Sequence, residues 1–382
     1  MKQIYFDNGS TSFPKAPGVG EAVYDFIGRG AFNINRGNYS GAYEVADIVL
    51  SAREGLAALF HVRDPQRVIF TPGVTYSLNY LIKGLLKPGD HVIVTSMEHN
   101  AVMRPLTQLC EQGIITYDVV GGDAEGVVRA VDFKQKIRSN TRAVIVLHAS
   151  NVCGTIVPIA EIGEICRAAG LYYAVDTAQT AGMLDIDMEG CRIDFLAFTG
   201  HKGLLGPQGI GGFIISERLD RALDPLITGG TGSKSDSLSM PDILPDKYES
   251  GTLNLPGIIG LHTALAYLET VDREALLKEK MKLTAYFLGA VKALPGVRVI
   301  GKQGLEDRVA VVSVDFTDHD NAVVAFELEQ RYGIMTRVGL HCAPMAHRTL
   351  RTFPRGTVRF SFGAANTTME IDTCITGLKV MV

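Results

Sequence analysis

The chain has 382 residues, of which 46% are hydrophobic and 20% are charged. This length and composition are typical of a globular protein with two domains, and they exclude a disordered chain. The 37 basic and 41 acidic residues nearly balance, so no electrostatic argument favours nucleic acid or an anionic membrane as a partner. The first residues lack the apolar segment of a signal peptide, and we expect a cytoplasmic protein without a membrane span.

Helical and strand-like segments alternate from about residue 45 to 216, which predicts an α/β fold with a mostly parallel sheet. The polar segment 228–239 interrupts this order and is expected to form a mobile surface loop, which could lie at a subunit contact. After Pro256, a long helical region to about residue 292 is expected. A strand at 309–316, a helix at Asn321–Tyr332 and a strand at 358–362 then predict a smaller α+β domain.

Four strand-like runs lead to polar side chains, in chain order His99, Asn151, Asp176 and Lys202. In an open α/β sheet, ligands bind beyond the carboxyl ends of the strands, so these side chains are expected to converge. A lysine amine can form a Schiff base with pyridoxal phosphate (PLP), while a carboxylate on the pyridine nitrogen keeps the ring protonated. We therefore predict a PLP site in which His99 stacks on the ring and Asn151 bonds its phenolic oxygen.

A phosphate site is expected where an apolar run gives way to a helix near residue 73. Gly73, Val74 and Thr75 place backbone N–H groups, a hydroxyl and the helix dipole where they can face an anion. On these residues alone, a simple helix cap is the alternative.

The six cysteines show neither a CxxC pair nor Cys/His ligand spacing, so the sequence predicts no metal site and no disulfide framework. Five of them lie in apolar or helical surroundings. Cys342 differs, because it follows His341 in a turn-like segment, a setting that favours a reactive thiolate.

Ordered motifs along nearly the whole chain resemble those of class V aminotransferase-fold enzymes, in particular the cysteine desulfurase and selenocysteine lyase branch. The motifs are Tyr5-Phe-Asp-Asn8, Asn35-Arg-Gly37, Thr71-Pro-Gly-Val-Thr75, Glu98-His-Asn100, Ser150-Asn-Val-Cys-Gly-Thr155, Ala174-Val-Asp-Thr-Ala-Gln179, Thr199-Gly-His-Lys202, Glu249-Ser-Gly-Thr-Leu-Asn254, Arg337-Val-Gly-Leu-His-Cys342 and Val358-Arg-Phe-Ser361. The resemblance implies a fold-type-I PLP enzyme. Its large PLP-binding domain would span 15–256, and its small domain would join 1–14 to 257–382.

The resemblance also implies further cofactor contacts, from Gln179, Thr199, His201 and, across a dimer interface, Thr252. The active sites of a homodimer would then be shared between two chains. Two positions depart from the pattern of relatives. Val74 replaces a hydroxyl residue, so only its backbone N–H can contribute, and Leu340 replaces a second histidine, so that side chain is not available for acid/base assistance.

An amino acid carboxylate is best bound by a guanidinium group, and Arg359 is the candidate because it lies in an apolar run where an unpaired charge is costly. A structural salt bridge is the alternative interpretation of Arg359. Arg36 and Asn151 are predicted as secondary contacts to the same carboxylate.

The activity that the resemblance implies is conversion of L-cysteine to L-alanine, with Lys202 removing the α-proton and a persulfide forming on Cys342. Because an ordinary thiol is mostly protonated at neutral pH, His341 or a nearby positive charge is expected to help form the nucleophile. A sulfur-acceptor protein is the expected partner. The alternatives are a selenocysteine lyase, a PLP-dependent epimerase or aminotransferase in which Cys342 is incidental, and a non-enzymatic sulfur-relay scaffold.

Overall fold

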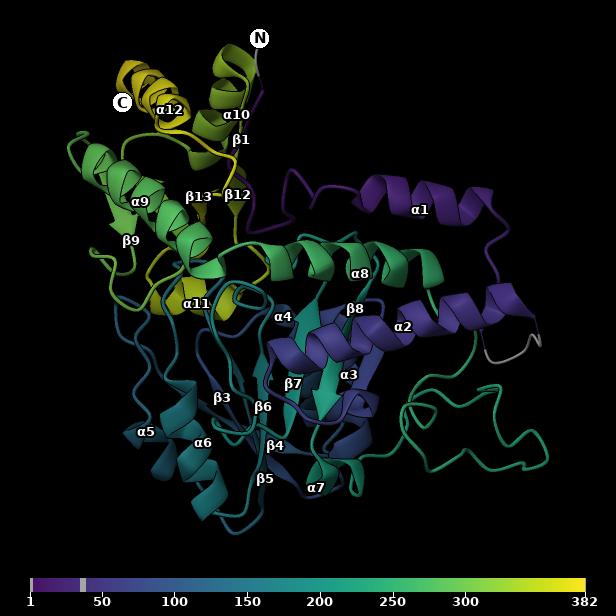
Figure 1. The fold of residues 1–382 in the computed structure, drawn as a ribbon. Coiled ribbons are helices and arrows are strands. Elements are labelled where there is room, and N and C mark those ends of the chain that lie inside the picture. Colours follow the sequence, from purple (N-terminus) through teal and green to yellow (C-terminus); the bar gives the residue numbers. More distant parts are fainter. Residues whose placement is uncertain (1–2, 35–38, 382) are drawn as a thin grey trace.

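The computed structural model describes residues 3–34 and 39–381, and its centre is a seven-stranded sheet (Figure 1). Neighbouring strands are parallel except for β8, which is antiparallel to both of its neighbours. The predicted α/β fold with a mostly parallel sheet is confirmed. The spatial order is β2 (Val68–Thr71), β8 (Gly211–Ile215), β7 (Phe195–Thr199), β6 (Tyr172–Asp176), β5 (Thr141–Leu147), β3 (His91–Thr95) and β4 (Thr116–Val120).

Both faces of this sheet are buried, because alternate residues of a strand point to opposite faces and both sets are apolar. In β3, Val92 and Val94 belong to one hydrophobic cluster, whereas Ile93 belongs to the other. Helix α8 packs against both α1 and α2 (Figure 1). The helices of this part are α1 (Val19–Gly28), α2 (Ser40–Leu59), η1 (Pro65–Arg67), α3 (Val74–Leu85), α4 (Asn100–Glu111), α5 (Val131–Lys134), α6 (Ile159–Ala168), α7 (Glu217–Asp220) and α8 (Leu255–Thr270).

The C-terminal part forms a four-stranded antiparallel sheet with its own hydrophobic core. Its strands are β12 (Arg337–Gly339), β13 (Thr357–Ser361), β10 (Val311–Phe316) and β9 (Val297–Ile300), and its helices are α9 (Arg273–Val291), α10 (Asn321–Tyr332), α11 (Pro344–Thr349) and α12 (Thr368–Met381). Strand β1 (Ile4–Tyr5) pairs in parallel with β11 (Ile334–Met335), so the N-terminal residues lie beside this part (Figure 1). The domain division at residues 14 and 256 stays a prediction.

The structure differs from the predicted elements at several boundaries. The helical region expected as far as residue 292 is divided at Val271, because Asp272 accepts a hydrogen bond from the backbone of Ala275 and starts α9 as its N-cap. The strand expected from 309 begins only at Val311. Between α7 and α8 the chain forms turns and bends without a helix or strand, including the predicted loop 228–239 (Figure 1).

Candidate active site

Asp176 and Lys202 lie at the same edge of the seven-stranded sheet, as the sequence predicted. Asp176 ends β6, and Lys202 follows the end of the neighbouring parallel strand β7 by three residues. The Asp176 carboxylate is buried and accepts a 2.8 Å hydrogen bond from the backbone N–H of Ala178. Burial raises the pKa of Asp176, although this N–H group and the charge of Lys202 oppose the shift.

The Lys202 side chain is partly buried. Burial lowers the pKa of Lys202 to about 8, a shift that Asp176 opposes and that Arg359 and Arg337 reinforce. An amine with such a pKa loses its proton much more readily than a surface lysine. It is therefore suited to act as a nucleophile and as a base.

His99 is the N-cap of α4, where its Nδ1 accepts a 3.0 Å hydrogen bond from the backbone N–H of Ala101. This bond fixes the orientation of the ring beyond the end of β3. Burial lowers the pKa of His99 to about 4, and the positive charge of Lys202 adds to the effect. The imidazole is thus neutral at neutral pH, which suits the predicted stacking against an aromatic ring.

The predicted phosphate site lies at the N-terminus of α3. Gly73 is the N-cap with φ 155°, a backbone conformation that residues with a Cβ rarely adopt, and a Cβ built there would lie 3.7 Å from Thr199 Oγ1. The backbone N–H groups of Val74 and Thr75 occupy the first helical positions, which have no intrahelical acceptor. A helix N-terminus without a side-chain cap, beside the Thr199 hydroxyl, can donate hydrogen bonds to a bound phosphate.

The buried polar atoms near these strand ends that lack a hydrogen-bond partner within the described residues include Asn151 Oδ1 and His201 Nδ1. Buried polar atoms are rarely left unpaired, so these atoms mark positions where polar atoms of a ligand fit. Together with the uncapped helix N-terminus, the buried Asp176 and the partly buried Lys202, they show that the residues present fit a PLP molecule.

Three further residues were predicted to contact the cofactor or the substrate, namely Gln179, Thr252 and Arg36. Gln179 donates a 3.1 Å hydrogen bond to the carbonyl of Gly9. Thr252 is exposed on the segment that precedes α8, as a residue that contacts a second chain would be. Arg36 lies outside the described residues.

The segment that carries Cys342 is tied directly to two of these strand ends. The backbone N–H of Asn100 donates a 2.8 Å hydrogen bond to the carbonyl of Cys342. Asn151 Nδ2 donates a 2.7 Å bond to the carbonyl of His341. His341 and Cys342 both have left-handed backbone conformations, with φ of 47° and 57°, which are uncommon for residues other than glycine. The structure thus brings the thiol-bearing turn to the residues after β3 and β5.

The positive charge beside the thiol belongs to Arg337. Its Nη2 lies 3.6 Å from Cys342 Sγ, and its Nη1 donates a 2.8 Å hydrogen bond to Ser10 Oγ. His341 instead is buried and bonds Thr357 Oγ1 at 2.9 Å. Burial, with the charge of Arg359, lowers the pKa of His341 to about 2. Of the two sources of assistance considered from the sequence, the structure therefore supports the nearby positive charge and not the histidine.

The similarity to known proteins extends over the whole fold. The model of the aminotransferase class-V family matches residues 4–374. The chain belongs to the aminotransferase class-V family. A probable cysteine desulfurase from Methanothermobacter thermautotrophicus is 32% identical to it over 96% of this chain and 92% of that protein. Enzymes of this family depend in general on PLP.

Solved structures of cysteine desulfurases resemble this class-V family member closely. An apo structure from Thermococcus onnurineus NA1 matches with a TM-score of 0.93 and 30% identity, over 100% of this chain and 94% of that one. The S-sulfonic acid form of cysteine desulfurase CsdA from Escherichia coli matches with a TM-score of 0.89 and 28% identity, over 99% and 94% of the two chains. The predicted family is therefore confirmed.

In this family member, Arg359 is paired with a carboxylate of the chain itself. Its Nη2 lies 2.7 Å from Asp7 Oδ1 and 2.8 Å from Ser10 Oγ, and its Nη1 donates to the carbonyl of Asn151 at 3.0 Å. The salt bridge that was the alternative interpretation is thus present. Arg359 Nε is buried without a partner in the described part of the chain, so the predicted carboxylate contact would use a donor that is still available.

Sequence reasoning assigned no role to Arg337, Asp7 or Ser10, although all three belong to the cluster around Arg359 and Cys342. One signal was present. Arg337 and Arg359 both lie on strand-like runs of the C-terminal part, and they are paired across β12 and β13. The sequence does not give the register of these two strands, so it could not show that Arg337 lies beside Arg359 in the site.

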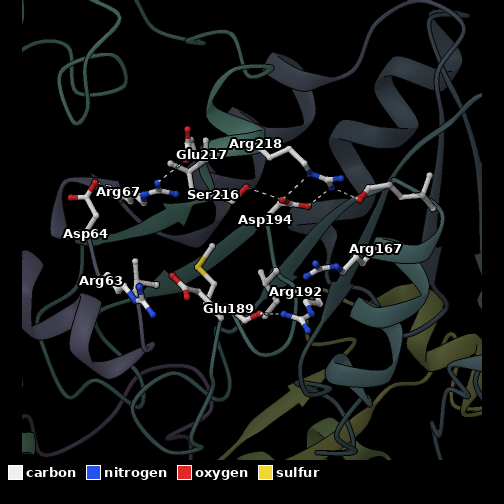
Figure 2. A pocket seen from close by; sticks show the side chains of 15 residues that line it. Arg63, Asp64, Arg67, Arg167, Glu189, Arg192, Asp194, Ser216, Glu217 and Arg218 are labelled. Atoms are coloured by element: carbon white, nitrogen blue, oxygen red, sulfur yellow. Dashed lines mark hydrogen bonds and ion pairs between the residues drawn. The ribbon is translucent and has the colours of Figure 1, made fainter.

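Another large cavity lies away from the predicted site residues, at the opposite edge of the seven-stranded sheet. It measures about 680 Å³ and is lined at the start of β7 by Asp194 and beyond β8 by Glu217. Figure 2 shows its charged rim, in which Asp194 is joined to Arg218 at 2.6 Å. Arg67 lies 3.6 Å from Glu217. Its arginines are interspersed with carboxylates, and none of the predicted site residues lines it.

Among residues 3–34 and 39–381, no group of three His, Cys, Asp or Glu side chains could hold a metal ion. No helix in the same ranges has the length and apolar character needed to cross a membrane.

Proposed function

We propose that this chain is a PLP-dependent cysteine desulfurase that acts in the cytoplasm as a homodimer. It converts L-cysteine to L-alanine, takes the sulfur onto Cys342 and passes it to an acceptor protein. Support comes from the similarity to cysteine desulfurases over nearly the whole chain and from side chains that fit the cofactor. The exposed Thr252 supports a second chain at the phosphate site.

PLP, when bound, would withdraw the electrons left on the substrate α-carbon. Gly73, Val74, Thr75, Gln179, Thr199, His201 and Thr252 would hold it. His99 would cover the ring and Asp176 would keep the ring nitrogen protonated. Lys202, with its lowered pKa, would take the α-proton and later return a proton to the product. The guanidinium of Arg359 would bind the substrate carboxylate.

In the sulfur step, the Cys342 thiolate attacks the substrate sulfur, the substrate carbon–sulfur bond breaks and a sulfur–sulfur bond forms. The electron pair left on carbon takes up a proton, so that cysteine and the Cys342 thiol become alanine and a Cys342 persulfide. No external oxidant is required. Arg337, 3.6 Å from Cys342 Sγ, would stabilise the thiolate and leave room for a persulfide that an acceptor can reach.

The observation that carries this proposal is the placement of Cys342. It is exposed, in contrast to the buried Cys153, Cys166 and Cys374, and it lies beside a guanidinium group. Its backbone is bonded to the residue after His99. A cysteine incidental to an epimerase or aminotransferase would not need an exposed thiol beside a positive charge at this position.

The test is to measure alanine and sulfide from L-cysteine in the presence of a reducing thiol, with L-selenocysteine in parallel. The Cys342→Ser variant should retain PLP and bind cysteine, because neither step uses the thiol. Its sulfide production should fall by at least about a hundredfold, since a hydroxyl is a far poorer nucleophile toward sulfur than a thiolate.

Cys110→Ser is the matched control, since Cys110 lies on α4 and is not part of the site. That variant should keep the parent rate. Survival of selenocysteine turnover alone in Cys342→Ser is compatible with the proposal, because selenium can leave without attack by the thiol. Desulfuration of cysteine by Cys342→Ser at the parent rate would exclude the proposed role of Cys342.

A further inference from the structure

A second cavity, of about 330 Å³, lies between the N-terminal segment and the start of α9. Lys202 and Gly203 line one side of it, and Lys280 of α9 lines another. His99, Asp176 and Cys342 do not line it, so it reaches the segment of Lys202 from a side other than the active site. A smaller hollow of about 40 Å³ shares Lys202, Gly203 and Lys280 and continues toward Gln179.

The charges of this cavity are of one sign. Lys15, Lys202 and Lys280 line it, whereas no Asp or Glu is among the described residues of its wall. Lys15 has its three donors satisfied, by Thr11 Oγ1 at 3.0 Å, Ser12 Oγ at 3.2 Å and the carbonyl of His201 at 2.9 Å. Lys15 therefore has no free donor for a ligand.

The ammonium group of Lys280, unlike that of Lys15, has no oxygen acceptor among its hydrogen bonds in the described chain. The acceptor closest to its Nζ is Met183 Sδ at 3.2 Å, and a thioether is only a weak hydrogen-bond acceptor. Burial lowers the pKa of Lys280 to about 8, with no neighbouring charge contributing to the shift. A partly buried ammonium group is costly without an anionic partner, and no carboxylate of the described chain contributes to the pKa shift of Lys280.

The remaining wall is mostly apolar. Leu205, Tyr267 and Leu276 contribute hydrocarbon and aromatic surface, and Phe13 and Pro14 contribute more from the N-terminal segment. An anion with an apolar body could place its charge on Lys280 and its body against this wall. Small inorganic anions would leave the apolar surface uncovered.

We propose that this cavity is a binding site for a small organic carboxylate with an aromatic or branched apolar body, whose carboxylate pairs with Lys280. The site is separate from the proposed cysteine site, because the residues of that site, apart from Lys202, do not line it. Its occupant contacts the Lys202–Gly203 segment, so binding is linked to the position of the proposed catalytic lysine.

The test is calorimetric titration of the holoenzyme with phenylacetate at pH 7. Acetate serves as a probe with the charge alone, and 2-phenylethanol as a probe with the ring alone. Phenylacetate should bind with millimolar or better affinity, and each partial probe should bind at least about tenfold more weakly. Lys280→Met should weaken phenylacetate binding at least about tenfold.

Lys278→Met is the matched control, because Lys278 lies on the same helix and is exposed. It should bind phenylacetate like the parent. Ala364→Trp provides a second test that retains Lys280. Ala364 is exposed and lines the cavity, so a bulky side chain there should obstruct it without disturbing the core.

Unchanged phenylacetate affinity in both Lys280→Met and Ala364→Trp would overturn the proposal, and would place the ligand at another site such as Arg359. Absence of phenylacetate binding to the parent enzyme would overturn it as well. Neither result would affect the proposed desulfurase activity, which is measured separately with cysteine.

Discussion

The ion pair between Arg53 and Glu249 offers the sharpest test of how the site is supported. Arg53 Nη2 lies 2.6 Å from Glu249 Oε2, and the two side chains are only 6% and 5% exposed. Glu249 Oε1 also accepts a 2.7 Å hydrogen bond from the backbone N–H of Phe70 in β2. These contacts fasten the segment that carries Thr252 to the strand that leads into Gly73.

Glu249→Gln keeps the shape of the side chain but leaves the Arg53 guanidinium buried without its counter-ion. Removing one partner of a buried pair costs about 3–5 kcal/mol in the free energy of unfolding. For 382 residues the entropy of unfolding is about 0.8 kcal/mol per degree, so the melting temperature should fall by about 4–6 °C if the chain unfolds as one unit.

The assay is thermal unfolding followed by circular dichroism, with all variants at one fixed PLP concentration because bound cofactor stabilises the native state. Glu217→Gln is the control. Its carboxylate is 62% exposed and pairs with Arg221 at the surface, so the same change should cost about 0–1 kcal/mol. Equal shifts in the two variants would refute the argument that burial makes the Arg53 pair important.

Three further predictions concern Lys202, Asp176 and a group of histidines with lowered pKa values. Lys202→Ala should abolish turnover and the cofactor adduct that borohydride fixes in the parent, and a reduced adduct mapped by mass spectrometry to another lysine would refute the assignment of Lys202. Asp176→Asn should retain most of the cofactor but lose turnover, so near-normal kcat would mean that Asp176 is not the partner of the ring nitrogen. Burial lowers the pKa of four histidines to about 4, namely His99, His148, His201 and His347. Between about pH 6.5 and pH 4 the unfolded chain therefore binds more protons at these histidines than the native chain does, so the free energy of unfolding should decrease as the pH falls through this range. His148→Gln should reduce the difference in melting temperature between pH 7 and pH 5, and an equal difference in parent and variant would contradict this contribution of His148.

The local sequence determined much of the sheet and of the cofactor residues. Short apolar runs that end on polar side chains predict buried parallel strands, and parallel strands bring their carboxyl ends to one edge. Asp176 and Lys202 were therefore predictable as neighbours, and the structure places them at the ends of β6 and β7. The helix start at Gly73 was predictable because glycine and hydroxyl residues there follow an apolar run.

The tertiary structure decided which charges meet at the proposed sulfur site. Asp7 and Arg359 are 352 residues apart in the chain, and their 2.7 Å contact depends on the packing of the N-terminal segment against β13. The guanidinium of Arg337 reaches Cys342 because the chain turns through two left-handed residues after β12. Hydrophobic periodicity predicts which face of a helix or strand is buried, but it does not predict which side chain from a distant part of the chain packs against that face. For this reason the sequence left open whether His341 or a nearby positive charge assists Cys342, whereas the fold places Arg337 beside the thiol and holds His341 neutral in the core.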